Sequence, residues 1–231
     1  MKAGRPVVKK SRAVRQPSVS APTLEKVIGT TAKGNNSIAY NNATGDVAYV
    51  ASGVVVFYNP ESNKQIGHLV NSNAVSISCV AFSSNGELLA TGEGSGRSPE
   101  ISIWNYTPPK LTLAKSLKGH KYGIDQLIFS PNSTYLVSIG VEHDKGLFVW
   151  NWSRGIRETS NKVSKKITSI AFSPDGSFFA TAGQNSIKCW QFKNDRPVTT
   201  AGSVNSEVKC MDSRPIDLAE MGDKTFISVT I

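Results

Sequence analysis

The sequence predicts an all-β fold built from about four repeated units and part of a fifth, and three observations support this prediction. First, residues 79–93, 127–141 and 170–184 align with one another, each with an apolar run, Phe-Ser, a turn and a second apolar run. Second, a short strand-like segment that ends in tryptophan follows each of them. Third, apolar stripes at helical spacing are scarce, whereas residues that favour turns are abundant. A repeat of this length with strand periodicity indicates stacked β-sheets.

Two sets of aromatic residues recur at similar intervals and mark the core of each unit. They are Phe82, Phe129 and Phe172, and Trp104, Trp150 and Trp190. The intervals are 47 and 43 residues in the first set, and 46 and 40 in the second. A fainter first unit places Tyr40 at the phenylalanine position and Phe57 at the tryptophan position. We expect these rings to be packed inside their sheets.

This pattern resembles the WD-repeat family, whose units are the four-stranded blades of a β-propeller. The Trp-Asp dipeptide of that family is replaced here by Trp-Asn or Trp-Gln. Residues 1–23 are basic, contain proline and serine and have almost no large apolar side chains, which predicts a disordered tail. The resemblance implies four blades over 24–195, divided at about 24–66, 67–115, 116–158 and 159–195. It also implies a partial fifth blade over 196–231. The final apolar run is cut off at the chain end, so an incomplete, truncated propeller is expected.

The segment Gly119-His120 permits two interpretations. His120, Ser138 and Asp144 could form a catalytic triad, but Ser138 lies in the middle of a predicted strand and no nucleophile-elbow motif surrounds it. In WD repeats, histidine precedes phenylalanine by nine residues and aspartate precedes tryptophan by six, and both spacings occur here. The resemblance therefore implies that His120, Ser138, Asp144 and Trp150 form a structural hydrogen-bonded tetrad. The other units are expected to depend on packing.

Composition limits the other classes of function. The net charge is +9, but six of the positive charges lie in residues 1–23, which contain no acidic residue. The remaining chain is only weakly basic, which argues against a nucleic-acid-binding face. The three cysteines are far apart and have no metal-ligand spacing, so neither a metal nor a cofactor is expected. No apolar stretch has the length of a membrane span or a signal peptide, and a cytoplasmic location is predicted.

Several unusual segments point to one group within the family. The segments GHKYGID at 119–125, VEHDKGLFVWNW at 141–152 and SNKVS at 160–164 resemble the mitogen-activated protein kinase-binding WD-repeat scaffolds, a group that includes a microcephaly-associated relative of the spindle pole. This resemblance implies a non-enzymatic scaffold for c-Jun N-terminal kinase signalling and for centrosome or spindle-pole organisation. In that group, kinase-docking segments lie downstream of this region. The alternative is an adaptor in another assembly, such as a ubiquitin ligase or an RNA-processing complex.

Basic and aromatic residues in two loops are the candidate protein-binding residues. Arg97 lies in the Gly-rich loop over 92–100, and Lys118, Lys121 and Tyr122 flank the Gly-His pair. Such a cluster could bind an acidic or phosphorylated peptide, although ordinary solvated loop charge is the simpler interpretation. The Gly-rich loop has no following Lys-Ser or Lys-Thr and no helix, which argues against nucleotide binding. In the tail, Ser18 follows Arg15 and is a possible phosphorylation site.

Overall fold

The computed structural model describes residues 24–31, 34–71, 76–193, 210–215, 226 and 228–230. These residues form sixteen β-strands and one short 3-10 helix, η1 (Asn35–Ser37). No α-helix occurs in this part of the chain, and its one 3-10 helix is too short to cross a membrane. The predicted tail over 1–23, including Ser18, lies outside the described residues.

The strands form four antiparallel sheets, and each sheet contains four strands that are consecutive in sequence. Sheet 1 consists of β1 (Ile38–Tyr40), β2 (Val47–Ala51), β3 (Val54–Asn59) and β4 (Lys64–Val70). Sheet 2 consists of β5 (Ile77–Phe82), β6 (Leu88–Glu93), β7 (Glu100–Asn105) and β8 (Thr112–Lys118). Sheet 3 consists of β9 (Ile124–Phe129), β10 (Tyr135–Gly140), β11 (Gly146–Asn151) and β12 (Ile156–Lys162). Sheet 4 consists of β13 (Ile167–Phe172), β14 (Phe178–Gly183), β15 (Ser186–Lys193) and β16 (Cys210–Pro215).

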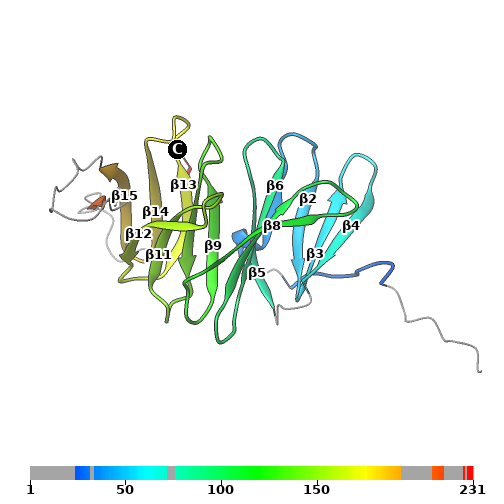
Figure 1. The fold of residues 1–231 in the computed structure, drawn as a ribbon, viewed down its shortest axis with the longest axis horizontal. Helices are drawn as coiled ribbons and strands as arrows, with labels where there is room; N and C mark the ends of the chain where they lie inside the picture. Colours follow the sequence, from blue (N-terminus) through cyan, green and yellow to red (C-terminus); the bar gives the residue numbers. More distant parts are fainter. Residues whose placement is uncertain are drawn as a thin grey trace, which may run out of the picture.

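The four sheets follow one another along the long axis of the molecule, with sheet 1 at one end and sheet 4 at the other (Figure 1). Strand β5 contacts both β1 and β9, and β9 contacts β13, so the first strands of successive sheets adjoin. This is the blade arrangement of a β-propeller. Within the described residues sheets 1 and 4 do not close into a ring. The prediction of an all-β, incomplete propeller is therefore confirmed.

Turn chemistry sets the register of the hairpins that begin sheets 2 and 4. In the turn between β5 and β6, Ser83 N–H donates to Leu88 O and Gly86 N–H donates to Ser83 O. Ser173, Gly176 and Phe178 repeat both bonds between β13 and β14. Gly86 and Gly176 each have a φ of +72°, a conformation that glycine adopts without steric cost. The Asn-Gly and Asp-Gly signals in the sequence reflect this requirement.

The repeated aromatic residues lie in matching rows across the sheets. Phe82 pairs with Leu89 and Leu89 with Trp104; Phe129, Leu136 and Trp150 form the same row in sheet 3, and Phe172, Phe179 and Trp190 form it in sheet 4. Each row packs against the preceding sheet, so three apolar clusters join the four sheets in series. Stability therefore comes from contacts between neighbouring sheets, as in other repeat proteins.

The first unit is offset by one residue from the sequence alignment. Tyr40 pairs with Val47 and Val47 with Tyr58, so Tyr58, and not Phe57, occupies the tryptophan position. A shift of one residue moves a side chain to the opposite face of a strand. Phe57 accordingly points toward sheet 2, where it is 0% exposed and its ring meets Tyr106 edge-on. The assignment of Phe57 to the tryptophan position was wrong because Phe57 and Tyr58 are adjacent and both aromatic, so either could mark that position in the sequence.

The predicted blade boundaries also differ from the sheets. Divisions after residues 66, 115 and 158 fall inside β4, β8 and β12, and each of these strands belongs wholly to the earlier sheet. In addition, β16 pairs with β15 and completes sheet 4, although residues 196–231 were assigned to a fifth blade. The fourth strand of each sheet is an edge strand, which pairs with a neighbour on one side only and carries no repeated aromatic residue. Its position is therefore difficult to predict from the sequence.

Phe226 and residues 228–230 lie beside β13, in the place where the first strand of a further sheet would begin. Phe226 N–H donates to Gly183 O, as Ile77 N–H donates to Ser52 O between sheets 1 and 2. Thr168 Oγ1 donates to Phe226 O, as Ser78 Oγ donates to Ile124 O between sheets 2 and 3. Of the residues assigned to the fifth unit, 210–215 thus complete sheet 4, and only Phe226 and residues 228–230 lie, among the described residues, where a further sheet would begin.

Candidate functional site

His120, Ser138, Asp144 and Trp150 lie in one continuous chain of hydrogen bonds in sheet 3. Trp150 Nε1 donates to Ser138 Oγ at 2.8 Å, and Ser138 Oγ lies 2.8 Å from His120 Nε2. His120 Nδ1 lies 2.8 Å from Asp144 Oδ1. The chain begins on β11, crosses β10 and ends in the two loops that precede β9 and β11. It joins elements up to 24 residues apart in sequence.

The electrostatics favour a neutral imidazole beside an ionised carboxylate. Burial lowers the pKa of His120, and the neighbouring Asp144 offsets this effect only in part. For Asp144, burial opposes ionisation, but hydrogen bonds from His120 and from two backbone N–H groups outweigh it and lower the pKa. Neutral His120 then donates from Nδ1 to Asp144 and accepts at Nε2 from Ser138. In this tautomer, each hydrogen bond of the tetrad has one donor and one acceptor.

Burial excludes the catalytic interpretation of these residues. Ser138 is 0% exposed and His120 is 4% exposed. The serine hydroxyl is also the acceptor for the Trp150 indole, and the His120 ring packs 4.4 Å from the ring of Phe148. A nucleophile must reach its substrate, and this hydroxyl lies inside the sheet.

The Asp144 carboxylate also fixes the loop between β8 and β9. Its Oδ2 accepts from Lys121 N–H at 2.5 Å and from Tyr122 N–H at 3.2 Å. Its Oδ1 accepts from Gly146 N–H at 3.2 Å. Charge-assisted bonds of this kind are stronger than neutral ones. The tetrad therefore determines where the backbone of the Gly-His loop lies, and with it the positions of Lys121 and Tyr122.

The other two tryptophan rows retain part of this arrangement. Trp104 Nε1 donates to Thr91 Oγ1 at 3.1 Å, and Trp190 Nε1 donates to Thr181 Oγ1 at 2.9 Å. Sequence reasoning expected packing alone in these units and missed both bonds. The signal was present, because Thr91 and Thr181 stand 13 and 9 residues before their tryptophans, as Ser138 stands 12 before Trp150.

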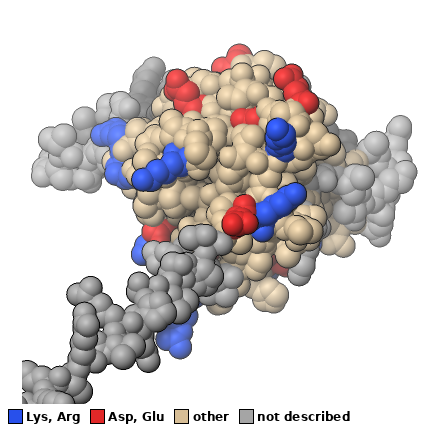
Figure 2. Space-filling view, turned by 90° about the vertical axis from the view of Figure 1, so that its right-hand side faces the viewer, with Lys and Arg blue, Asp and Glu red and all other residues tan. Residues whose placement is uncertain are grey.

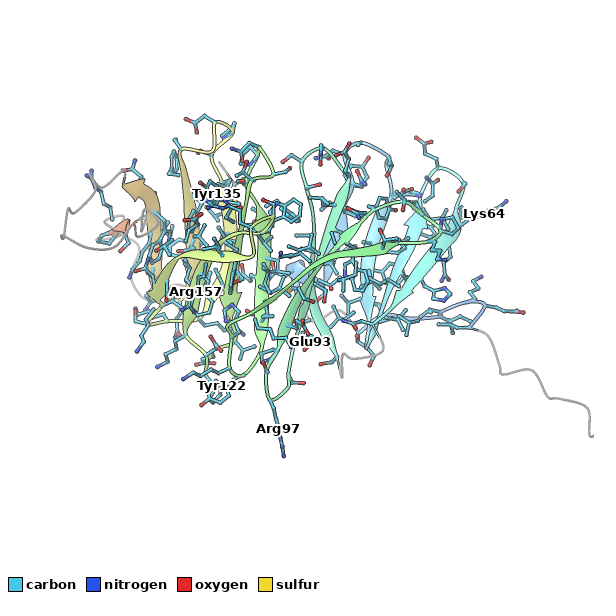
Figure 3. The ribbon with its side chains drawn as sticks, viewed as in Figure 1. Lys64, Glu93, Arg97, Tyr122, Tyr135 and Arg157 are labelled. Carbon is cyan, nitrogen blue, oxygen red and sulfur yellow. The ribbon has the colours of Figure 1, made fainter. Side chains whose placement is uncertain are left out.

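We term Arg97, Lys118, Lys121 and Tyr122 the loop surface. Arg97 lies in the loop between β6 and β7, Lys118 is the last residue of β8, and Lys121 and Tyr122 lie in the loop between β8 and β9. Figure 3 shows Arg97 and Tyr122 projecting from the same end of the molecule. Tyr122 is 58% exposed, and Arg97 and Lys121 are also exposed. Lys118 Nζ lies 3.7 Å from Glu100 Oε2, so a neighbouring carboxylate partly offsets its charge.

The two loops meet through glycine. A Cβ at Gly123 would lie only 2.3 Å from the carbonyl oxygen of Gly94, and Gly94 N–H in turn donates to Ser76 O at 3.0 Å. A second close approach explains the glycine of the Gly-His pair, because a Cβ at Gly119 would lie 2.8 Å from the Trp150 ring. These glycines permit the loops to pack closely.

A cavity of about 850 Å³ lies beside the first strands of the sheets. Its lining combines the charged Asp125 and Lys166 with Gln126 and several hydroxyl side chains, including Ser78, Ser95 and Thr168. Burial raises the pKa of Asp125, and Lys166 partly offsets the effect. The sequence did not predict this cavity because its lining residues come from six separate segments, between Thr31 and Thr168. Among the described residues, no group of three or more His, Cys, Asp or Glu side chains is placed to hold a metal ion.

Comparisons with known proteins agree with this architecture. The chain is 38% identical over 215 residues to mitogen-activated protein kinase-binding protein 1 of Mus musculus, an alignment that covers 93% of this chain and 14% of that protein. It is 39% identical over 207 residues to WD repeat-containing protein 62 of Sus scrofa, which covers 90% of this chain and 13% of the relative. The chain thus spans about one seventh of the length of these relatives.

Two further comparisons concern the repeat and the fold. A chain from the crystal structure of the mitotic checkpoint complex superposes with a TM-score of 0.57 at 21% identity, over 68% of this chain and 47% of that chain, and it shows the fold alone. The family model described as WD domain, G-beta repeat matches residues 61–105, 111–151 and 157–191, which together exceed half of the chain. The chain therefore belongs to the WD-repeat family.

Proposed function

We propose that this chain is a non-enzymatic protein-interaction module of a scaffold, and that the loop surface binds an acidic or phosphorylated segment of its partner. The observation that carries the proposal is the contrast at Tyr122. Its side chain is 58% exposed, whereas its backbone N–H is held by the Asp144 carboxylate of the tetrad. A fixed exposed aromatic residue beside cationic side chains loses little entropy on binding and suits anionic peptides.

The similarity to a mitogen-activated protein kinase-binding protein favours a partner in the same class. We therefore propose a component of the mitogen-activated protein kinase pathway, with the c-Jun N-terminal kinase branch as the first partner to test. A cytoplasmic location and association with the centrosome or spindle pole remain predictions from the family resemblance. Adaptor function in a ubiquitin-ligase or RNA-processing complex is the alternative.

The proposal is tested with a triple variant in which Arg97, Lys121 and Tyr122 are each replaced by alanine. The purified chain is immobilised, and binding of purified c-Jun N-terminal kinase and its upstream kinases is measured, each in phosphorylated and unphosphorylated form. Loss of the exposed ring and of two cations should weaken binding by at least about tenfold. Raising the salt concentration should weaken binding to the unmodified chain as well, because exposed charges are screened.

A matched control separates this effect from a general change of charge. Lys64 and Arg154 are exposed and lie in or beside turns remote from the loop surface, and Figure 3 shows Lys64 away from Arg97 and Tyr122. A variant with both replaced by alanine should bind as tightly as the unmodified chain. Equal binding by the triple variant would remove the loop surface from consideration. Binding of a different class of protein in the same assay would favour the adaptor alternative.

A further inference from the structure

Four serine or threonine residues are followed directly by proline, and the structure places them differently. Ser130 and Ser173 are each 3% exposed, and their hydroxyl groups donate hydrogen bonds inside their own hairpin turns. Ser98 is exposed, but the proline that follows it is buried. In the fourth pair, Thr107 and Pro108, both residues are exposed. Thr107 is therefore the one hydroxyl of the four that a second protein can reach together with its proline.

Thr107 lies in the loop 106–111 between β7 and β8, which has a fixed base and an exposed turn. Tyr106 at the base is 6% exposed, and its hydroxyl donates to Asp46 Oδ2 at 3.0 Å. The four residues that follow Tyr106 are all exposed. Thr107 Oγ1 donates to Lys110 O at 2.9 Å, and water can replace this exposed bond at little cost. The turn can therefore open without disturbing the core beneath it.

The residues after Thr107 fit the substrate groove of a proline-directed protein kinase. Where the pocket for the residue after the acceptor hydroxyl offers no partner for a backbone N–H, proline is favoured, because proline has no N–H to leave unpaired. Pro108 occupies this position. Lys110 lies three residues after Thr107, where its ammonium group can pair with an anionic group of the kinase. The segment therefore suits a kinase that requires proline at the first of these positions and prefers a cation at the third.

We propose that Thr107 is a phosphorylation site for a proline-directed kinase of this kind. The Thr107 hydroxyl oxygen attacks the γ-phosphorus of ATP, the bond between that phosphorus and the β,γ-bridging oxygen breaks, and ADP leaves. The hydroxyl proton passes to the catalytic base of the kinase. This chain supplies the acceptor hydroxyl, and the kinase supplies the ATP site and the base.

Phosphorylation would change one hydrogen bond and the local charge. The phosphoester oxygen has no proton, so the bond to Lys110 O is lost, and about 1.5 to 2 negative charges are added. The loop adjoins sheet 1, because a Cβ at Gly67 on β4 would lie 3.5 Å from Pro109 Cα. Figure 2 looks onto the sheet 1 end, where charged side chains of both signs are separated by broad uncharged areas. A phosphate beside such a surface creates an anionic site that a partner with Arg or Lys side chains can recognise.

Phosphorylation of the folded full chain in vitro tests the proposal. The chain is incubated with ATP and a purified cyclin-dependent kinase, and the phosphate is located by mass spectrometry of proteolytic fragments. We expect about one phosphate per chain, on Thr107. Thr107→Val removes the acceptor and should lower the initial rate by at least about tenfold. Pro108→Ala keeps the hydroxyl but should lower the rate at least about tenfold as well, because it adds an N–H that the kinase pocket leaves unpaired.

Both positions are exposed, so both variants should fold, as circular dichroism would verify. The matched control is Ser98→Ala, which removes an exposed hydroxyl that precedes a buried proline and should leave the rate unchanged. A folded chain that takes up no phosphate, or takes it up on another serine or threonine in place of Thr107, would overturn the proposal. Labelling of a synthetic peptide of residues 102–114 without labelling of the folded chain would overturn it too, because the turn would then be closed to the kinase.

The proposal is independent of binding at the loop surface. Arg97 precedes β7 and Thr107 follows it, so the two residues lie beyond opposite ends of the same strand. The triple variant of the loop surface should therefore be phosphorylated on Thr107 at an unchanged rate, whether or not it has lost a partner.

Discussion

At the scale of single residues, the tetrad determines the protonation state of its histidine. The folded chain disfavours the imidazolium because burial lowers the pKa of His120, whereas the unfolded chain keeps a pKa near 6.5. The unfolded state therefore binds a proton first as pH falls. The contribution of His120 to stability is fully present above about pH 6.5 and declines as pH decreases below that value.

We expect His120→Gln to reduce the free energy of unfolding at pH 7.5 by about 1–3 kcal/mol, because it leaves buried partners without their hydrogen bonds. The difference between the unmodified chain and the variant should narrow between pH 6.5 and pH 5, since the variant lacks the titrating ring. Urea unfolding at several pH values, followed by tryptophan fluorescence, measures both effects. A difference that stays constant or widens toward pH 5 would show that burial does not control this histidine.

At the scale of elements, close packing of two loops positions the loop surface. Gly123 tolerates no side chain without movement of the backbone, because a Cβ would lie 2.3 Å from Gly94 O and 3.1 Å from Val141 Cγ1. The loops that carry Arg97 and Tyr122 therefore depend on each other for their positions.

We expect Gly123→Ala to destabilise the chain by about 1–3 kcal/mol through overpacking. The control is Gly34→Ala, because a Cβ at Gly34 meets nothing within 4 Å and its φ of −165° suits any residue. That change should alter stability by less than about 0.5 kcal/mol. Urea unfolding of both variants gives the comparison, and equal stability of the two would mean that the loops separate without cost.

The elements also reveal how far the sequence determines the fold. The spacing of the Phe and Trp residues located three of the sheets, because these rings must pack inside a blade. The nine- and six-residue intervals around His120 located all four members of the tetrad, because their buried polar atoms need hydrogen-bond partners. The first unit was offset because Phe57 and Tyr58 are both aromatic. Strand β16 was assigned to the wrong unit because an outer strand pairs on one side only and has few constraints on its sequence. The cavity near Asp125 and Lys166 depends on the curvature of the array, which no local pattern encodes.

At the scale of the whole molecule, the sheets are joined in series, and each contributes a core to the next. The consequence is an array with two distinct kinds of surface. One is polar and lies at the loop end, where Asp144 fixes the backbone beneath Lys121 and Tyr122. The other is the side of sheet 1 that faces away from sheet 2, where Val27 N–H donates to Gln65 Oε1. The functional account depends chiefly on the first, and specifically on the tetrad holding that loop in place.

Hydrogen exchange of individual backbone amides in the intact chain tests this claim most directly. The Lys121 and Tyr122 amides should exchange slowly in the unmodified chain, because both donate to Asp144 Oδ2. In Asp144→Ala they should exchange at least about tenfold faster, while the Gly86 amide, which donates to Ser83 O in sheet 2, should keep its rate. Lys121 and Tyr122 amides that exchange equally fast with and without the Asp144 carboxylate would contradict the account.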